Sequence, residues 1–462
     1  MIHPNRHTER RRSLGQRVSG PILLMGCGDR SRNLPMNKLP FRQDSTFLYF
    51  TGCVLPNAAL IIVGGESTLF VPNPADDDAL WHGEADDFNA LRRRFDVDEV
   101  ADISDLEATV RRLQPRTLAI ADESVNARIG EWLGCTLCFG LNYGDDSLVD
   151  AVIAMRRTKG ADELHEMRLA ALDTAAAHRA VLGATRPGGH ERGLAALFEA
   201  VLALRGSVPG YSTILTQSGE VLHHHGHEQE LKAGRLLLLD GGGERVDSGY
   251  GADVTRTWPV NGRFDGRQRA AYDAVLEAQE AAIAKVRAGN RYREVHATAC
   301  RVLARWLADE KLLRVSPDES VEIGAHAIFF PHGIGHHLGL DVHDLENFGD
   351  RPSYPARQGR TPLFGTAYLR LDLPLVPGWV VTVEPGFYVV PAILRDRALR
   401  ERLGQAVDFE RASSWIGFGG IRIEDDIAVT EGEPENLTAA IPKRATDLEA
   451  LIGTGPCLED LF

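Results

Sequence analysis

Residues 236–260 read LLLLDGGGERVDSGYGADVTRTWPV, and this stretch decides the fold of the C-terminal part of the chain. Four leucines lead into Asp240, which predicts a buried strand with a carboxylate at its end. The β-branched and aromatic residues after Asp253 predict a second strand. A buried aspartate must be paired, hydrogen-bonded or metal-bound, because an isolated buried carboxylate protonates. Taken separately, Asp240 could instead be a turn residue, and Asp253 an exposed charge on an edge strand.

Three further metal-binding side chains follow in similar surroundings. Glu384 ends an apolar run, and Glu424 lies in the alternating segment 420–426, for which a solvent-facing charged strand is the alternative. His336 lies in the histidine-rich segment 332–344, where glycines disfavour a helix. No glutamate follows His332, so the segment is not the HExxH zinc helix. Four carboxylates and one imidazole have the charge to hold two divalent cations. The sequence therefore predicts a dinuclear metallohydrolase whose metal ligands are Asp240, Asp253, His336, Glu384 and Glu424.

Bulk composition narrows the class of protein. A chain of 462 residues is too long for one ordinary hydrophobic core, so we expect two domains. The net charge of −14 argues against a nucleic-acid partner. No apolar stretch approaches the roughly 20 residues that span a membrane, and the N-terminus lacks the apolar segment of a signal peptide. Six cysteines are too sparse for a disulfide framework, and the CxxC pair Cys135 and Cys138 is weak evidence for zinc. We therefore expect a cytoplasmic protein.

The first 150 or so residues predict a small α/β domain. Residues 105–113 have helical spacing, and short apolar runs on either side predict buried strands. Neither a GxGxxG nor a P-loop pattern occurs in this region, so no phosphate-binding loop is expected. The expected strands are residues 21–25, 59–63, 68–71 and 117–120.

The remaining chain predicts an α+β domain. From Asp162 onward, apolar residues recur every three or four positions, which predicts a long amphipathic helix. A second helix follows Asp265 and is expected to end at Gly289. Separated strands joined by hairpin-like turns complete the pattern. The expected strands are residues 235–240, 253–260, 380–384 and 420–429.

Taken in order, these segments resemble the pita-bread metallopeptidases, in the branch that holds the Xaa-Pro aminopeptidases (aminopeptidase P) and the Xaa-Pro dipeptidases (prolidases). The resemblance covers the last 300 residues, and residues 41–52 are similar to the N-terminal domain of aminopeptidase P. It implies an α+β fold: a small α/β N-terminal domain, residues 1–158, followed by a pita-bread (creatinase/aminopeptidase-like) catalytic domain, residues 159–462.

The resemblance also implies roles for individual residues. In this family the five positions named above bind two metal ions, and Glu384 also acts as general base. His343 supports the tetrahedral intermediate, while His223 and His332 position the scissile carbonyl and the proline. Tyr211 lies beside the metals, and Arg422 anchors the face that carries Glu424. Oxygen-rich ligation with one imidazole favours Mn²⁺, with Co²⁺, Fe²⁺ and Zn²⁺ as alternatives. His224, His225 and His227 are expected to be surface loop residues.

Two departures from the family pattern affect the predicted substrate. Asp240 and Asp253 lie 13 residues apart, which implies a longer hairpin turn than usual. A long insertion spans Leu345–Pro377, and its end resembles the prolidase segment whose arginine, here Arg370, grips the free carboxylate of a dipeptide. The expected enzyme is an Xaa-Pro aminopeptidase, with a prolidase that uses Arg370 as the alternative.

Two other classes of function compete with a proline-specific metallopeptidase. A metal-free hydrolase of the creatinase type would have lost ligand carboxylates, and none is lost here. A non-catalytic binding protein of the same fold would tolerate Asp253→Ala in everything except stability. The expected partners are peptides with proline at the second position, and family analogy adds a homodimer or higher homo-oligomer.

Overall fold

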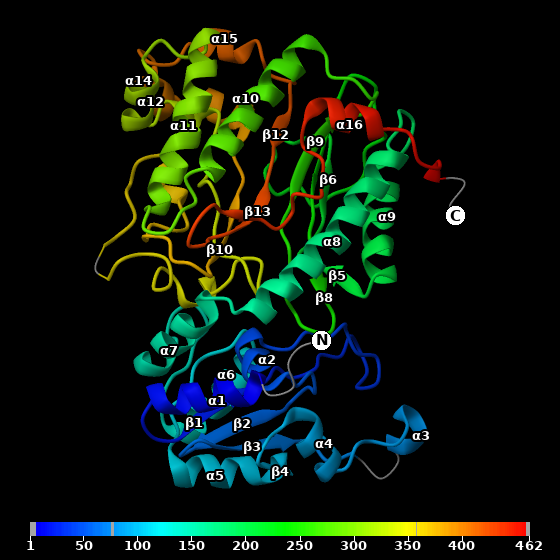
Figure 1. The fold of residues 1–462 in the computed structure, drawn as a ribbon, viewed down its shortest axis with the longest axis vertical. Helices are drawn as coiled ribbons and strands as arrows, with labels where there is room; N and C mark the ends of the chain where they lie inside the picture. The colour runs from blue at the N-terminus through cyan, green and yellow to red at the C-terminus, as the bar shows by residue number, and fades with distance from the viewer. Residues whose placement is uncertain (1–5, 75–77, 357, 459–462) are drawn as a thin grey trace. The chain divides into compact units, whose positions relative to one another are not determined.

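The computed structural model describes residues 6–74, 78–356 and 358–458 (Figure 1). The chain forms two compact units. The first comprises residues 1–156 together with 345–352, and the second comprises 157–344 and 353–462. Among the described residues, no helix combines the length and the apolar character needed to cross a membrane.

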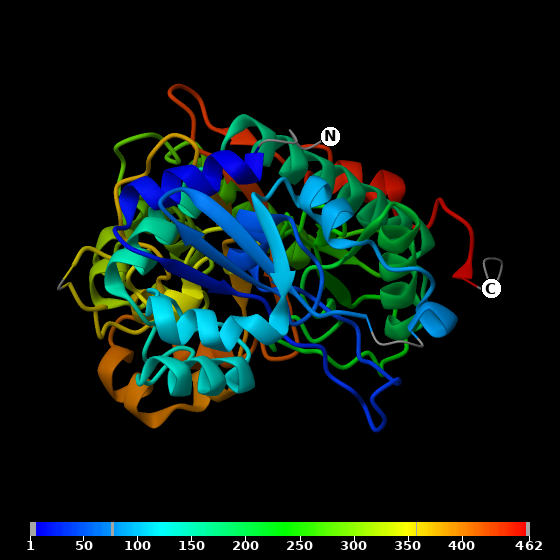
Figure 2. The same ribbon diagram turned by 90° about the horizontal axis from the view of Figure 1, so that it is seen from below.

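A four-stranded sheet in the order β1-β2-β3-β4 forms the centre of the first unit. Its neighbours pair antiparallel, except for β3 and β4, which are parallel. In the view of Figure 2, helix α1 (Arg6–Arg17) lies along one side of the blue strands. The cyan helices α5 (Leu106–Leu113) and α6 (Glu123–Leu133) lie along the other side. The strands are β1 (Ile22–Met25), β2 (Ala59–Val63), β3 (Glu66–Val71) and β4 (Glu99–Asp102).

Helix caps account for several boundaries in this unit. The Asp44 side chain accepts a hydrogen bond from the backbone N–H of Phe47 and so begins α2, and Gly52 ends it with φ of 63°. The expected helix 105–113 is α5, Leu106–Leu113. The other helices are α2 (Ser45–Thr51), α3 (Asp78–His82), α4 (Phe88–Phe95), η1 (Ile103–Asp105), α6 (Glu123–Leu133) and α7 (Asp146–Arg157).

The prediction of a strand at residues 117–120 is wrong. This segment is buried, but within the described part of the chain it forms only one isolated antiparallel bridge, between Leu118 and Gly144. In that bridge Thr117 O accepts from Asp145 N, and Ala119 N donates to Tyr143 O. An apolar run predicts burial, whereas a strand also needs a continuous partner. The fourth strand of the sheet is β4, which sequence periodicity did not reveal.

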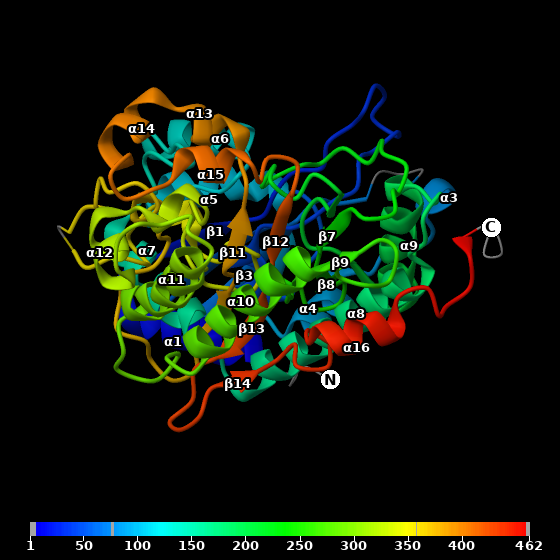
Figure 3. The same cartoon turned by 90° about the horizontal axis from the view of Figure 1, so that it is seen from above.

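The second unit contains several short sheets between two groups of long helices. Figures 1 and 3 show the strands in the middle, with α8 (Ala161–Ala184) and α9 (Glu191–Leu204) on one side. On the other side lie α10 (Gly266–Ile283) and α11 (Tyr292–Asp309). The sheets have the orders β6-β7-β9, β10-β13-β14, β11-β12 and β5-β8. The strands are β5 (Ser207–Pro209), β6 (Ile214–Thr216), β7 (Leu236–Asp240), β8 (Gly243–Arg245), β9 (Thr255–Pro259), β10 (Val380–Val383), β11 (Gly386–Tyr388), β12 (Gly420–Arg422), β13 (Asp425–Ala428) and β14 (Glu435–Asn436).

Both long helices expected in this unit are present. Asp265 caps α10 by accepting from Gln268 N, but the helix ends at Ile283, and Gly289 instead forms a later turn with φ of 85°. The remaining helices are α8 (Ala161–Ala184), α9 (Glu191–Leu204), α10 (Gly266–Ile283), α11 (Tyr292–Asp309), α12 (Pro317–Ile323), η2 (His326–Ile328), η3 (Glu346–Phe348), η4 (Thr366–Tyr368), α13 (Pro391–Arg395), α14 (Arg397–Leu403), α15 (Phe409–Ser413) and α16 (Ala445–Leu451).

Two expected strand features differ from the structure. The single strand expected at 420–429 is divided into β12 and β13, which belong to different sheets, so Glu424 lies at the break between them. The connection from Asp240 to Asp253 is not a simple hairpin turn, because β8 lies within it and pairs with β5. Gly242 allows this path: a Cβ atom there would lie 1.7 Å from the carbonyl oxygen of Ala252.

The expected insertion, residues 345–377, is shared between the two units. Its first part, residues 345–352, belongs to the N-terminal unit. There Arg351 pairs with Asp146 and Asp150 of α7, at 2.5 and 2.7 Å. The part from residue 353 onward belongs to the second unit.

Candidate active site

A cavity of about 930 Å³ lies within the second unit. Backbone from strand ends, the histidine-rich loop and the insertion all contribute to its wall. Every site residue expected from the sequence lines it: Tyr211, His223, Asp240, Asp253, His332, His336, His343, Arg370, Glu384, Arg422 and Glu424. The fold therefore brings together side chains that are distant in sequence.

The four carboxylates lie at or beside the ends of strands. Asp240 is the last residue of β7, and its register partner Thr255 is the first residue of β9, so Asp253 lies just before that strand begins. Glu384 lies between β10 and β11, and Glu424 lies between β12 and β13. At such breaks a side chain is held by sheet on both sides, while its carboxylate is free to face the cavity.

The histidine-rich loop contributes the imidazole. Nδ1 of His336 lies 2.9 Å from the carbonyl oxygen of His337. A carbonyl can only accept, so Nδ1 carries the proton and Nε2 keeps its lone pair. That Nε2 lies 3.4 Å from Asp253 Oδ2 and 3.6 Å from Glu384 Oε1. Donor atoms of Asp253, His336 and Glu424 all lie within 4.8 Å of one another, a spacing that suits a shared cation.

The electrostatics of this cluster favour added positive charge. Burial raises the pKa of Glu384 to about 7, and it raises the pKa of Asp240 and of Glu424 as well. Repulsion from the other carboxylates adds to each shift, whereas Arg422 opposes it. Divalent cations would supply the missing charge and favour the ionised carboxylates, so the donor set fits two such ions.

Neighbouring polar groups orient the carboxylates. Arg422 Nη2 lies 2.6 Å from Asp240 Oδ2, and Arg422 Nε donates to Thr255 Oγ1. Thr255 in turn donates to Glu424 Oε2 at 2.6 Å. The hydroxyl of Tyr211 lies 2.7 Å from Asp240 Oδ1 and 2.5 Å from Asp253 Oδ1. These contacts fix the side-chain directions before any ion binds.

Three further histidines surround the open side of the cluster. Burial lowers the pKa of His332 to about 3 and also lowers the pKa of His223. The proximity of His336, together with burial, lowers the pKa of His343 to about 2. Nη1 of Arg370 lies 3.5 Å from His343 Nδ1. Neutral imidazoles can donate or accept hydrogen bonds without bringing a charge of their own.

Sequence reasoning missed several residues of this cavity. Tyr388 bonds both His332 and Arg422, and strand alternation from Glu384 through Gly386 would have placed it on the same side. His225, expected to be only a surface residue, also lines the cavity. Arg360 and Tyr368 reach it from the insertion, whose irregular backbone has no periodicity to read.

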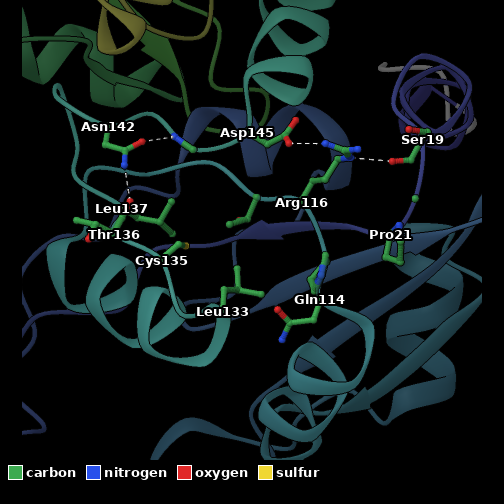
Figure 4. Close-up of a pocket in the computed structure, with 14 residues that line it drawn as sticks. Ser19, Pro21, Gln114, Arg116, Leu133, Cys135, Thr136, Leu137, Asn142 and Asp145 are labelled. Carbon is green, nitrogen blue, oxygen red and sulfur yellow. Dashed lines mark hydrogen bonds and ion pairs between the residues drawn. The ribbon is translucent and has the colours of Figure 1, made fainter.

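A second cavity, of about 530 Å³, lies in the first unit (Figure 4). Its charged groups pair with each other: Arg116 donates to Asp145 Oδ2 at 2.5 Å and to Ser19 O at 2.8 Å. Cys135 also lines it, and both Cys135 and Cys138 are free thiols. In the described part of the chain neither thiol belongs to a group of three or more metal-binding side chains.

The model of metallopeptidase family M24 matches residues 165–431, more than half of the chain. The chain belongs to metallopeptidase family M24. A model of the aminopeptidase P N-terminal domain matches residues 7–119. The chain is therefore an M24 metallopeptidase with an aminopeptidase P-type N-terminal region, which confirms the family expected from the sequence.

Relatives of similar length carry a more specific name. A probable Xaa-Pro aminopeptidase of Ajellomyces capsulatus is 33% identical over 97% of this chain and 96% of its own. One of Penicillium rubens is 34% identical over 89% of each.

Solved structures agree with the fold. The Pseudomonas aeruginosa aminopeptidase PepP has a TM-score of 0.81 at 28% identity, over 98% of this chain and 99% of its own. Zinc-substituted Escherichia coli aminopeptidase P in complex with product has a TM-score of 0.79 at 29% identity, over 98% of each chain. The expected α+β architecture, an aminopeptidase P N-terminal domain plus a pita-bread catalytic domain, is thus confirmed.

Proposed function

We propose that this M24 enzyme is an Xaa-Pro aminopeptidase, a metal-dependent hydrolase that removes the first residue from peptides with proline at the second position. The observation that carries the proposal is the convergence of Asp240, Asp253, His336, Glu384 and Glu424 in one cavity. Relatives of matching length named Xaa-Pro aminopeptidase support the substrate class.

The five side chains would hold two divalent ions, which lower the pKa of a water molecule and stabilise the developing oxyanion when bound. Four carboxylates and one imidazole favour Mn²⁺, with Co²⁺, Fe²⁺ and Zn²⁺ as alternatives. Because four negative charges balance two doubly charged ions, the loaded cluster is close to neutral in its buried position.

The chain's own groups then move the proton and orient the peptide. Glu384 takes the proton of the attacking water and returns it to the proline nitrogen as the peptide bond breaks. His343 donates a hydrogen bond to the oxygen of the tetrahedral intermediate. His223 and His332 position the scissile carbonyl and the prolyl ring. Arg422 and Tyr211 hold the carboxylates of Asp240 and Asp253 in place.

A second candidate function is that of a prolidase. It is favoured by Arg370, which lies at the cavity beside His343 and could pair with the free carboxylate of a dipeptide. In a longer peptide this carboxylate is replaced by an amide, so the guanidinium of Arg370 would have no charge to pair with there.

Comparison of peptide lengths tests the two candidates. The protein is loaded with Mn²⁺, and kcat/KM is measured for Ala-Pro, Ala-Pro-Pro and a longer Xaa-Pro peptide. An aminopeptidase cleaves the longer peptides at least as well as Ala-Pro, and Arg370→Ala leaves that cleavage largely intact. Preference for Ala-Pro, abolished by Arg370→Ala but not by Arg360→Ala, would establish the prolidase instead. No cleavage of any of them, with Asp253→Ala behaving like wild type, would favour a non-catalytic protein.

We further propose that the N-terminal domain comprises residues 1–158 and the catalytic domain residues 159–462. By family analogy the enzyme forms a homodimer or higher homo-oligomer. The sparse free cysteines suit a reducing cytoplasm.

A further inference from the structure

A second cluster of metal-binding side chains lies outside the active-site cavity. His296 and Cys300 are four residues apart on α11, and His326 begins η2. In Figures 1 and 3, α11 lies beside α10 and α12. The segment η2 follows α12 directly in the chain. The three side chains are buried, and their donor atoms all lie within 4.8 Å of one another. None of the three lines the active-site cavity.

The spacing of two donors already matches that around a single ion. Sγ of Cys300 lies 3.5 Å from Nε2 of His296. A sulfur about 2.3 Å and a nitrogen about 2.0–2.1 Å from a tetrahedral zinc ion are about 3.5 Å apart. Sγ also lies 3.8 Å from Nδ1 of His296, so the sulfur faces the edge of the ring, and a rotation of the ring would turn a nitrogen lone pair toward a shared ion. The i, i+4 positions place both side chains on one face of α11, so this rotation needs no distortion of the helix.

His326 has the tautomer that a metal ligand needs. Its Nδ1 lies 3.1 Å from the carbonyl oxygen of Ser320, so Nδ1 carries the proton and Nε2 keeps the lone pair. Within the described residues this fully buried Nε2 has no hydrogen-bond partner. An acceptor buried in this way costs stability unless something binds it. His336 has the same arrangement, with Nδ1 on a backbone carbonyl and Nε2 facing the ligand cluster.

We propose that His296, Cys300 and His326 bind one Zn²⁺ ion at a site separate from the dinuclear centre. A thiolate with two imidazoles selects zinc, whereas the oxygen-rich cluster in the cavity favours harder ions. Three protein donors leave a fourth position for a water molecule. When the ion binds, the Cys300 thiol releases its proton to solvent and a sulfur–zinc bond forms.

The ionisation states of the two imidazoles agree with this site. Burial lowers the pKa of His296 to about 3 and that of His326 to about 4, so both are neutral near pH 7. Neutral imidazole is the form that binds metal. Burial also raises the pKa of the Cys300 thiol, so a buried thiol without zinc would be inert to oxidants and alkylating reagents.

The proposed ion would stabilise the wall of the active site from behind. The ring of Phe330 lies 5.7 Å from the ring of His296 and 4.8 Å from the ring of His332, measured between centroids. His332 lines the cavity. An ion that joins α11 to η2 would therefore fix the first residues of the segment that carries His332.

Cobalt spectroscopy tests the site selectively, because only a thiolate ligand gives Co²⁺ an intense near-ultraviolet charge-transfer band and the active-site ligands include no sulfur. The full-length enzyme is produced in cobalt-supplemented cells and its spectrum is recorded. We expect the band in the wild type and in Cys53→Ser, a buried cysteine outside the cluster. We expect its complete loss in Cys300→Ser. Absence of the band in the wild type, or its persistence in Cys300→Ser, would overturn the proposal.

X-ray absorption of the zinc-loaded wild type provides a test that needs no variant. A sulfur neighbour at about 2.3 Å from zinc is expected, because one of the bound ions has a thiolate ligand. A spectrum explained by oxygen and nitrogen neighbours alone refutes the site, even if Cys300→Ser fails to fold. In a folded Cys300→Ser variant, tightly bound zinc should fall by one ion per chain, whereas Cys53→Ser should retain it.

Discussion

The hydroxyl group of Tyr388 lies 2.9 Å from Nε2 of His332. Because His332 Nδ1 faces the carbonyl oxygen of Gly333 at 2.8 Å, Nε2 is the acceptor and the phenol is the donor. The same phenol oxygen accepts from Arg422 at 3.0 Å. A single side chain thus links a histidine on the substrate side to the arginine that holds Asp240.

Tyr388→Phe should lower kcat/KM for an Xaa-Pro peptide by about ten- to a hundredfold, the loss expected from a hydrogen bond to a charged group. The phenyl ring keeps the packing, so the unfolding midpoint should change little. Tyr368→Phe is the control, because Tyr368 also lines the cavity but is 55% exposed. Equal kcat/KM of the two variants would show that the hydrogen bonds of Tyr388 do not contribute to catalysis.

Thr382→Val should weaken metal binding by about ten- to a hundredfold. Thr382 Oγ1 accepts from the backbone N–H of His336 at 3.1 Å and lies 3.5 Å from Glu384 Oε1. Valine has nearly the same shape without the hydroxyl. Activity is titrated against free Mn²⁺, with Thr298→Val as the control, because Thr298 is a half-buried residue of α11 whose hydroxyl donates to the carbonyl oxygen of Glu294. The mutant curve should shift to higher Mn²⁺ and reach a plateau, whereas superimposed curves would contradict the prediction.

Arg256→Met should destabilise the catalytic unit by about 3–5 kcal/mol, the cost of breaking a fully buried ion pair. Arg256 Nη2 lies 2.7 Å from Asp425 Oδ1, and both side chains are 0% exposed. Lys443→Met should cost less, because Lys443 binds the same carboxylate but is 20% exposed. Urea unfolding of both variants measures the two losses of unfolding free energy. A larger loss in Lys443→Met than in Arg256→Met would contradict the prediction.

Acid should destabilise the protein partly through His7. Burial, with smaller contributions from Arg6, Arg10 and Arg11, lowers its pKa to about 3. The unfolded chain binds this proton near pH 6.5 and the folded chain does not, so stability is lost as pH falls from about 6.5 towards 3.

His7→Gln keeps a donor for the carbonyl oxygen of Tyr49, which His7 Nδ1 contacts at 3.0 Å, but cannot take up a proton. Between pH 7 and pH 5 the wild type should lose about 1–2 kcal/mol more free energy of unfolding than the variant. Parallel pH profiles of the urea midpoint would mean that His7 is accessible to protons in the folded protein.

The sequence predicted the carboxylate-bearing strand ends well, because apolar runs that stop at Asp240 and Glu384 combine a strong strand signal with a costly buried charge. It failed where tertiary partners decide the backbone. The break between β12 and β13 follows from pairing with two different strands, β11 and β10, which alternation along residues 420–429 cannot reveal. Likewise, 117–120 has the composition of a strand but no continuous neighbour.

Side chains from irregular backbone were the least predictable. Arg360 and Tyr368 reach the cavity from the insertion. His296 and Cys300 gave no distinct signal, because a histidine and a cysteine one turn apart on a buried helix face look like ordinary core residues. Only the fold adds His326, whose position depends on how the chain returns after α12.

The assignment of residues 345–352 to the first unit makes that unit discontinuous in sequence. The chain passes between the units at residues 156–157, 344–345 and 352–353. A gene divided once, after residue 156, would therefore not yield two self-sufficient halves. The C-terminal product would carry Phe348 and Arg351 without their neighbours Tyr143, Asp146 and Asp150. Each half would therefore lack contacts that the intact chain makes within one unit.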